Sequence, residues 1–295
     1  MRHNLPTVPI FRDTPAGGQI EELALRVVVE LPNWELRIIG TATLIGTHLA
    51  LTAKHVLSEA MKSFRTKSTP GGKIEVEGGS LQLLQILPGP IYRFWKVMTA
   101  WITSSDIAIL HLSLDRTSES DAKVDWRGLA LRATPPPSGQ KVIAFGFRES
   151  TVNVTRGPDG QSHIVLNDKP TTSAGVVGQI FQVQRDSGML NFPCFEVQAQ
   201  FAPGMSGGLV LDEEGQLCGL VCAGLKLDDP NQPPLSYAAT LWPLLTTMIS
   251  GDRGDAYPRG VSYPAIDLAL DGIIGMNHLE DLDPALFPGR TLPRR

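Results

Sequence analysis

Three segments of the sequence carry side chains that can act as a nucleophile, a base and an orienting acid. His55 follows Leu51-Thr52-Ala53-Lys54, Asp106 opens the apolar run 107–110, and Ser206 lies in the glycine-rich stretch 203–208. A serine hydroxyl is a poor nucleophile unless a base such as imidazole lies within hydrogen-bond reach. A carboxylate on the other ring nitrogen fixes the tautomer and stabilises the imidazolium. The three residues therefore predict nucleophilic catalysis by a serine.

The motifs around these residues also point to a family. Thr52-Ala53-Lys54-His55, Asp106-Ile107-Ala108-Ile109-Leu110 and Gly204-Met205-Ser206-Gly207-Gly208 together resemble the trypsin-like (chymotrypsin-fold) serine peptidases. The chain order His, Asp, Ser is the order of that family and differs from the order in subtilisins and α/β-hydrolases. The resemblance covers about residues 22–250. It implies a serine endopeptidase that hydrolyses peptide bonds of a protein substrate through an acyl-enzyme, with a His55, Asp106 and Ser206 triad.

The resemblance implies further site residues. The backbone N–H groups of Gly204 and Ser206 would form the oxyanion hole. Gln200 would lie at the base of the primary specificity pocket and Leu235 on its wall, while Cys222-Ala223-Gly224 would pair with the substrate backbone as an added strand. Because no acid stands at the pocket base, we expect a medium apolar or small polar side chain rather than arginine or lysine before the cleaved bond.

Other acids and histidines fit these roles less well. Three acidic rivals of Asp106 lack an apolar run directly after them (Asp115, Asp121 and Asp125). Four histidines lack such partners, and we expect them to be structural or exposed (His48, His111, His163 and His278). A contribution of Asp228 and Asp229 to the pocket stays open.

Two differences from the family's pattern indicate which branch of the family the sequence resembles most. Met205 stands where secreted animal members carry an aspartate that pairs with the N-terminus freed by zymogen cleavage. Arg37-Ile38-Ile39-Gly40 resembles a cleavage site, but Ile38 lies only 17 residues before His55, where cleavage would cut a barrel strand. The pattern is therefore closer to bacterial cytoplasmic and HtrA-like protease domains than to secreted zymogens.

The distribution of short apolar runs predicts an all-β fold. Strand-like runs separated by turn signals every about 8–12 residues are typical of β-sandwiches and barrels. The resemblance implies two packed six-stranded antiparallel β-barrels with the active site in the cleft between them. We expect an N-terminal segment at 1–21, a first barrel at 22–133 with His55 and Asp106, a Pro-rich linker at 134–140, a second barrel at 141–250 with Ser206, and a C-terminal extension at 251–295. The predicted strands of the second barrel include Lys141–Phe147, Ser173–Gln184 and Leu209–Leu211, and a hairpin turn at Asp212–Gly215 follows the last of them. A short helix would end this barrel, with Thr240 as its cap and Pro243 in its first turn, because apolar residues recur at helical spacing at Leu241, Leu244, Leu245 and Met248.

Composition excludes several classes of function. The net charge of −4 argues against nucleic acid as the main ligand, and no uninterrupted apolar stretch approaches the length of a membrane span. The first residues lead into no apolar signal region. The sequence has three cysteines. Cys218 and Cys222 would be about 13 Å apart in a strand, which is too far for a disulfide. This lack of a disulfide framework favours a cytoplasmic location. Cys and His are not clustered at ligand spacing, so we expect no metal and no cofactor.

Two alternatives to a constitutively active peptidase stay open. One is a catalytically silent protease-like module that binds a peptide or protein in the cleft. The other is a restrained peptidase that a partner activates, because an unrestrained cytoplasmic protease would harm its host. The extension at 251–295 would then dock an activating or inhibitory protein, brace the second barrel or cover the cleft.

Overall fold

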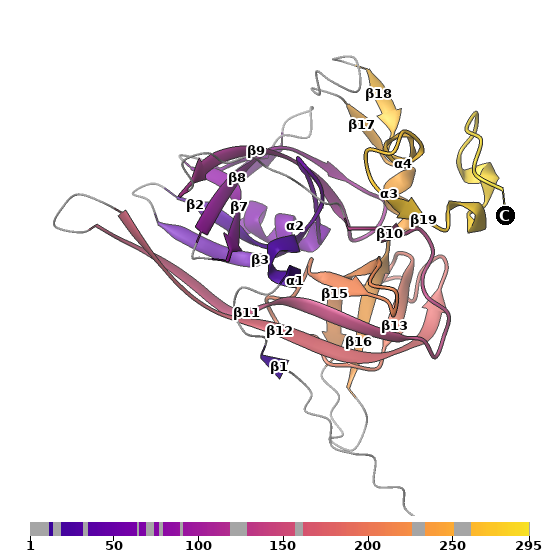
Figure 1. Cartoon of the computed structure of the whole chain (residues 1–295), viewed down its shortest axis with the longest axis horizontal. Helices are drawn as coiled ribbons and strands as arrows, with labels where there is room; N and C mark the ends of the chain where they lie inside the picture. The colour runs from indigo at the N-terminus through magenta and orange to yellow at the C-terminus, as the bar shows by residue number, and fades with distance from the viewer. Residues whose placement is uncertain are drawn as a thin grey trace, which may run out of the picture.

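The computed structural model describes residues 12–13, 19–31, 35–63, 65–68, 74–76, 79–88, 91–118, 129–156, 162–225, 234–250 and 261–294. Strands dominate these residues, and their longest helix, α2, has 10 residues. The strands close into two six-stranded antiparallel barrels, with the purple first barrel above the orange and pink second barrel in Figure 1. The predicted all-β fold is confirmed.

The first barrel forms because its strands alternate between interior and exterior positions. Leu25, Val27 and Val29 pack in its core, whereas Val28 between them faces a different apolar cluster. Its closed order is β2-β3-β4-β9-β8-β7. These strands are β2 (Ala24–Glu30), β3 (Leu36–Gly46), β4 (Leu49–Thr52), β7 (Ser80–Leu87), β8 (Ile91–Ile102) and β9 (Ala108–Thr117), and a small hairpin of β5 (Thr66–Ser68) and β6 (Ile74–Val76) precedes β7.

The second barrel closes through β14, which pairs with both β11 and β15. Its core includes Val142, Phe195 and Val221. The six strands are β11 (Lys141–Arg156), β12 (Ser162–Phe181), β13 (Cys194–Val197), β14 (Leu209–Leu211), β15 (Leu217–Leu225) and β16 (Leu235–Thr240). The β14–β15 hairpin confirms the turn predicted at Asp212–Gly215. Outside the barrel, β1 (Arg12–Asp13) pairs with β12, and α1 (Gln19–Leu23) precedes β2.

The β11–β12 hairpin joins the two barrels. It is much longer than the strands predicted at Lys141–Phe147 and Ser173–Gln184, and its outer half runs beneath the first barrel (Figure 1). Val152 and Leu166 of this outer half pack with Val28 of β2 in one apolar cluster. The guanidinium of Arg26, also in β2, binds Asp168 of β12 at 2.6 Å. The hairpin therefore holds the barrels in a fixed relation.

The C-terminal extension packs on the second barrel within residues 261–294. Leu268 and Phe287 are buried in the same apolar cluster as Tyr237 of β16. The elements here are β17 (Met248–Ser250), β18 (Ser262–Pro264), α4 (Ile266–Leu270), β19 (Met276–Asn277) and short 3-10 turns at Leu279–Asp281 and Pro284–Leu286; β19 continues the sheet through β10 (Leu131–Arg132) to β15. This part of the chain is continuous with the core rather than a separate tail.

The helix predicted at the end of the second barrel is shorter than expected. It is α3 (Trp242–Leu245), with Pro243 in its first turn as predicted. The predicted cap is wrong: the helix begins after Leu241, and the Thr240 hydroxyl donates to the Pro193 carbonyl at 3.2 Å instead. Met248, counted in the helix by its spacing, belongs to β17 because the chain turns at 246–247 to pair with β18.

Candidate active site

His55 lies at the second position of helix α2 (Lys54–Ser63), directly after strand β4. Val56, Leu57 and Ala60 of this helix are buried in the core of the first barrel. Since residues one position apart point about 100° apart around a helix, burying Val56 directs His55 away from the core. Its side chain is 47% exposed. The helix thus fixes the imidazole at the edge of the first barrel.

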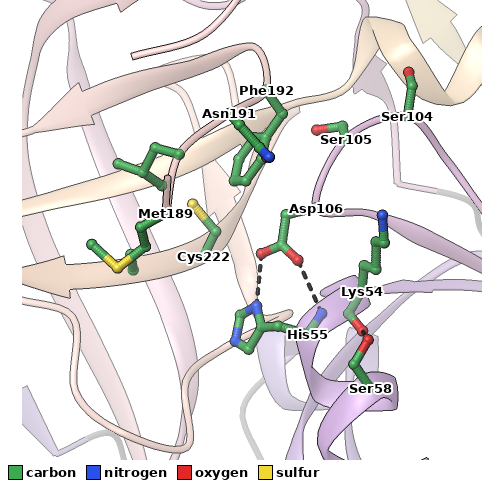
Figure 2. Close-up of a pocket in the computed structure, with 12 residues that line it drawn as sticks. Lys54, His55, Ser58, Ser104, Ser105, Asp106, Met189, Asn191, Phe192 and Cys222 are labelled. Atoms are coloured by element: carbon green, nitrogen blue, oxygen red, sulfur yellow. Dashed lines mark hydrogen bonds and ion pairs between the residues drawn. The ribbon is translucent and has the colours of Figure 1, made fainter. Parts of the chain in front are cut away.

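Asp106 binds His55 through both carboxylate oxygens, one at the imidazole and one at the backbone N–H (Figure 2). Its Oδ2 lies 2.7 Å from Nδ1 of the ring, and its Oδ1 accepts the backbone N–H of His55 at 3.0 Å. A carboxylate only accepts hydrogen bonds, so Nδ1 carries the proton and Nε2 is left with a free lone pair. This is the tautomer that a general base requires.

A tight turn presents Asp106 to the ring. The Thr103 hydroxyl accepts the N–H of Ser105 at 3.1 Å and lies 2.9 Å from the carbonyl of Ile107, which closes the turn in front of β9. The Asp106 side chain is only 10% exposed. A nearly buried carboxylate with two donors from one residue is well suited to orient that residue.

The loop around Ser206 requires glycine. Gly204 and Gly207 have φ angles of +94° and +81°, a conformation that L side chains rarely adopt. A Cβ on Gly204 would lie 2.6 Å from the Phe147 carbonyl, and one on Gly207 would overlap the Thr41 carbonyl. The loop therefore passes tightly between β11 of the second barrel and β3 of the first.

The backbone N–H groups of this loop alternate between paired and unpaired. Those of Met205, Gly207 and Gly208 donate to carbonyls of Ala202, Val221 and Met205. Those of Gly204 and Ser206 donate to no acceptor among the residues that the structure describes. Unpaired N–H groups are uncommon in folded proteins, and two such groups flanking a serine provide the donors that a developing oxyanion needs.

The Ser206 loop lies against the start of the His55 helix. The Ser206 carbonyl accepts the N–H of Thr41 at 2.9 Å. A Cβ on Gly40 would lie 3.3 Å from that carbonyl and 2.8 Å from the side chain of Val56, the residue after His55. In the described part of the chain, no hydrogen bond joins Ser206 Oγ to the imidazole. Catalytic hydrogen bonds are often long without substrate and shorten when it binds.

A cavity of about 330 Å³ opens beside His55 and Asp106. Cys222 and Ala223 line it, as do residues 189–192 of the second barrel (Figure 2). The cavity therefore lies between the two barrels. Sequence reasoning did not find residues 189–192, because Met189-Leu190-Asn191-Phe192 belongs to a loop without a recognisable motif.

Asp186 stabilises the loop that carries residues 189–192, called the cavity loop below. Its Oδ1 accepts the N–H groups of Gly188 at 2.9 Å and Leu190 at 3.2 Å. The N–H of Leu190 is the main cause of a lowered pKa of Asp186. The charged carboxylate therefore stabilises the turn that brings Leu190 to the cavity.

The remaining predicted substrate-binding residues lie elsewhere on the second barrel. Gln200, Gly224 and Leu235 are not among the residues lining the cavity beside His55. The carbonyl of Gln200 accepts the Ser173 hydroxyl at 2.7 Å, Gly224 pairs with Ser236, and Leu235 pairs with Leu225. Their role in specificity stays a prediction, while residues 226–233, which include Asp228 and Asp229, lie outside the described part.

The three cysteines are free and buried. Burial raises the pKa of Cys194 to about 11. Burial also raises the pKa of Cys222, and the charge of nearby Asp106 raises it further. The Cys222 thiol donates to the Tyr237 carbonyl at 3.0 Å. These thiols stay protonated at neutral pH, so none of them is an activated nucleophile.

One cluster of described residues has donor atoms close enough to hold a metal ion. Single donor atoms of His278, Glu280 and Asp281 lie within 4.8 Å of one another near the C-terminus. Nδ1 of His278 is 3.3 Å from Asp281 Oδ2. All three side chains are partly or fully exposed, and none of them lines the cavity beside His55.

Comparisons with known proteins agree with this geometry. Residues 40–220 match the family model described as "Trypsin-like peptidase domain". The chain is 27% identical over 173 residues to a protein of Staphylococcus aureus named "Serine protease HtrA-like", and the match covers 54% of this chain. The chain spans about a fifth (21%) of that relative's length.

Two solved structures are similar in fold. The Rv3671c protease of M. tuberculosis in its active form is 17% identical with a TM-score of 0.44, and the match covers 83% of this chain and 91% of that one. The HtrA-type protease AlgW, solved with a tripeptide, is 15% identical with a TM-score of 0.43, and the match covers 75% of this chain and 56% of that one. No helix in the described part of this chain is long and apolar enough to cross a bilayer.

Proposed function

The chain belongs to the trypsin-like peptidase domain family, and from this premise we propose that it is a serine endopeptidase that cleaves peptide bonds of a protein substrate through an acyl-enzyme. Ser206 is the nucleophile, His55 the general base and acid, and Asp106 the carboxylate that orients His55. The observation that carries the proposal is the double contact between Asp106 and His55, with Oδ2 at 2.7 Å from Nδ1 of the imidazole and Oδ1 at 3.0 Å from the backbone nitrogen.

The chemistry follows from the tautomer. Nε2 of His55 takes the Ser206 proton as Oγ attacks the scissile carbonyl carbon. The carbonyl oxygen becomes an oxyanion, and the unpaired N–H groups of Gly204 and Ser206 donate to it. The imidazolium, stabilised by Asp106, then gives its proton to the leaving amine. A water activated by His55 hydrolyses the acyl-enzyme in the reverse sequence.

The specificity assignments belong to the same proposal. Cys222, Ala223 and Gly224 at the end of β15 pair with the substrate backbone, and Gln200 and Leu235 shape the primary pocket. The half-buried Ala223 lines the same cavity as His55, which supports the pairing, because a substrate strand placed there reaches His55 as well.

Restraint of the activity is the second part of the proposal. The missing hydrogen bond between Ser206 Oγ and the imidazole supports a peptidase that a bound substrate or protein partner completes. The same observation favours the alternative function, a catalytically silent module that binds a peptide or protein in the cleft. The burial of Leu268 and Phe287 supports a bracing role for the extension, with any partner limited to its exposed face. Cytoplasmic location, inferred from the free cysteines, is also a proposal.

Hydrolysis of a fluorescently labelled, unfolded casein tests the proposed function. We expect peptide release by the wild type, and none by Ser206→Ala or His55→Ala. His278→Ala is the matched control, since His278 also pairs with an aspartate but lies outside the cavity. Equal release by wild type and Ser206→Ala would refute serine catalysis. Binding of casein without hydrolysis would favour the silent module.

A further inference from the structure

Thr41 makes four hydrogen bonds, two of which connect the first barrel to the Ser206 loop. It lies in β3 and is fully buried. Its N–H donates to the Ser206 carbonyl at 2.9 Å, and its hydroxyl donates to the Gly204 carbonyl at 2.9 Å. The hydroxyl also accepts the Phe147 N–H at 3.2 Å, which leaves its single proton for Gly204. The Thr52 hydroxyl donates to the Thr41 carbonyl at 2.7 Å.

These contacts fix two peptide planes of the loop. The Gly204 carbonyl belongs to the peptide before Met205, and the Ser206 carbonyl belongs to the peptide before Gly207. Because each peptide is planar, anchoring its carbonyl sets its orientation. The peptide that carries the Ser206 N–H lies between these two anchored peptides. Thr41 therefore restricts the direction in which the Ser206 N–H points.

The loop has other contacts besides those of Thr41. The Gly208 N–H donates to the Met205 carbonyl at 2.8 Å, and the Thr43 hydroxyl donates to the Gly207 carbonyl at 3.3 Å. A Cβ on Gly146 would lie 2.8 Å from the Cα of Met205, so β11 already touches the loop on its other side. The Met205 side chain is fully buried. The described structure gives the Gly204 carbonyl one hydrogen-bond donor, the Thr41 hydroxyl. Loss of that hydroxyl leaves both this carbonyl and the Phe147 N–H without their partner.

We propose that Thr41 is a positioning residue that holds the backbone N–H groups of Gly204 and Ser206 in the orientation of an oxyanion hole. The first barrel thereby controls an oxyanion hole built by the second. This inference rests on the proposed peptidase function for its catalytic consequence. Its structural part, the fixed orientation of the loop, holds whether or not the protein hydrolyses peptides.

Three substitutions isolate the hydroxyl. Thr41→Val keeps the shape and removes the hydroxyl, Thr41→Ser keeps the hydroxyl, and Thr41→Ala is a second variant without it should the valine fail to fold. Thr240→Val is the matched control, because Thr240 is also a buried strand threonine whose hydroxyl donates to a carbonyl, that of Pro193. Melting temperatures establish that each variant is folded.

The first readout is covalent labelling by a fluorophosphonate, measured as a maximal rate and a half-saturating concentration. Removing an oxyanion donor outright costs about 10²–10³ in rate in serine peptidases. Thr41 acts through the backbone, so we expect Thr41→Val to lower the maximal rate by about 10–100-fold. The half-saturating concentration should stay within about twofold, since oxyanion contacts act in the transition state. Thr41→Ser should restore the rate, and Thr240→Val should leave it unchanged.

The second readout is amide hydrogen exchange of residues 204–208, which needs no activity. We expect faster exchange in Thr41→Val than in wild type, Thr41→Ser or Thr240→Val. Unchanged exchange and labelling in folded Thr41→Val and Thr41→Ala would overturn the positioning role. A wild type that is not labelled refutes a peptidase that is active at rest and leaves the restrained peptidase and the silent module. The exchange comparison alone then decides on Thr41: faster exchange in Thr41→Val supports the positioning role and equal exchange refutes it.

Discussion

Replacing Asp106 with asparagine tests the geometry at His55 most sharply. The backbone N–H of His55 can only donate, and it donates to Asp106 Oδ1 at 3.0 Å. In Asp106→Asn the amide oxygen keeps this position, so the amide NH₂ faces Nδ1 of the ring. Nδ1 then has to accept, and the ring proton moves to Nε2. His55 in this tautomer cannot take the proton of Ser206.

Two losses set the size of the effect. Rotating the amide to recover the productive tautomer breaks a hydrogen bond in a nearly buried site, at about 1–3 kcal/mol. Loss of the carboxylate charge removes a charged hydrogen bond to the imidazolium, about 1.5–3 kcal/mol. Together these amount to about 3–6 kcal/mol, or about 10²–10⁴ in rate. Triads of this type lose about 10⁴ in kcat on the same change.

The rate constant of fluorophosphonate labelling measures this loss. Asp281→Asn is the matched control, because Asp281 pairs with His278 at 3.3 Å outside the cavity, and it should label at the wild-type rate. A folded Asp106→Asn protein whose labelling rate constant lies within tenfold of that of the wild type would refute the claim that Asp106 fixes the tautomer of His55.

Three further predictions concern the loop, the extension and the thiols. Gly204→Ala should lower the labelling rate by more than about tenfold and cost about 1–3 kcal/mol of stability, since φ is +94° and the new Cβ meets the Phe147 carbonyl. Leu268→Ala should lower the free energy of unfolding in urea by about 2–5 kcal/mol, and Leu270→Ala, at a site 37% exposed, by much less. Equal losses would contradict bracing. The buried thiols should resist iodoacetamide at pH 8 in folded protein and react in urea. Stability should fall as the pH rises above 9.0, where unfolded thiols ionise while Cys194 stays protonated to about 11; rapid alkylation of native protein would contradict this.

The sequence predicted the strands that consist of a short, continuous apolar run. It missed strands whose burial depends on contacts with the other barrel. Leu209–Leu211 was predicted with its true bounds, since a hairpin turn follows it directly. β8 was missed because Phe94 and Trp95 are buried next to each other, which breaks the period of two, and the charged Lys96 interrupts the apolar run. The outer half of the β11–β12 hairpin was missed because Val152 is buried only by contact with the first barrel.

The same difference between local sequence signals and long-range contacts applies to the candidate site. The triad residues were recognisable because their chemistry fixes residue types at short spacing, and the structure brings His55 and Asp106 together at 2.7 Å. Helix α2 was not predicted, because the apolar run before His55 indicated only the preceding strand and no element was assigned to His55 itself. The cavity loop at 189–192 and Thr41 carry no motif. Their importance comes from contacts across more than 130 residues of chain, as in the bond from Thr41 to Gly204.

Whether Ser206 is a nucleophile activated by His55 is tested most directly by the intact mass of the protein after incubation with a fluorophosphonate, followed by peptide mapping. We expect one adduct on the wild type, located on Ser206 and absent from Ser206→Ala and His55→Ala. An adduct that persists in His55→Ala at the wild-type rate, or that maps to another residue, would contradict the assignment of Ser206 as a nucleophile activated by His55.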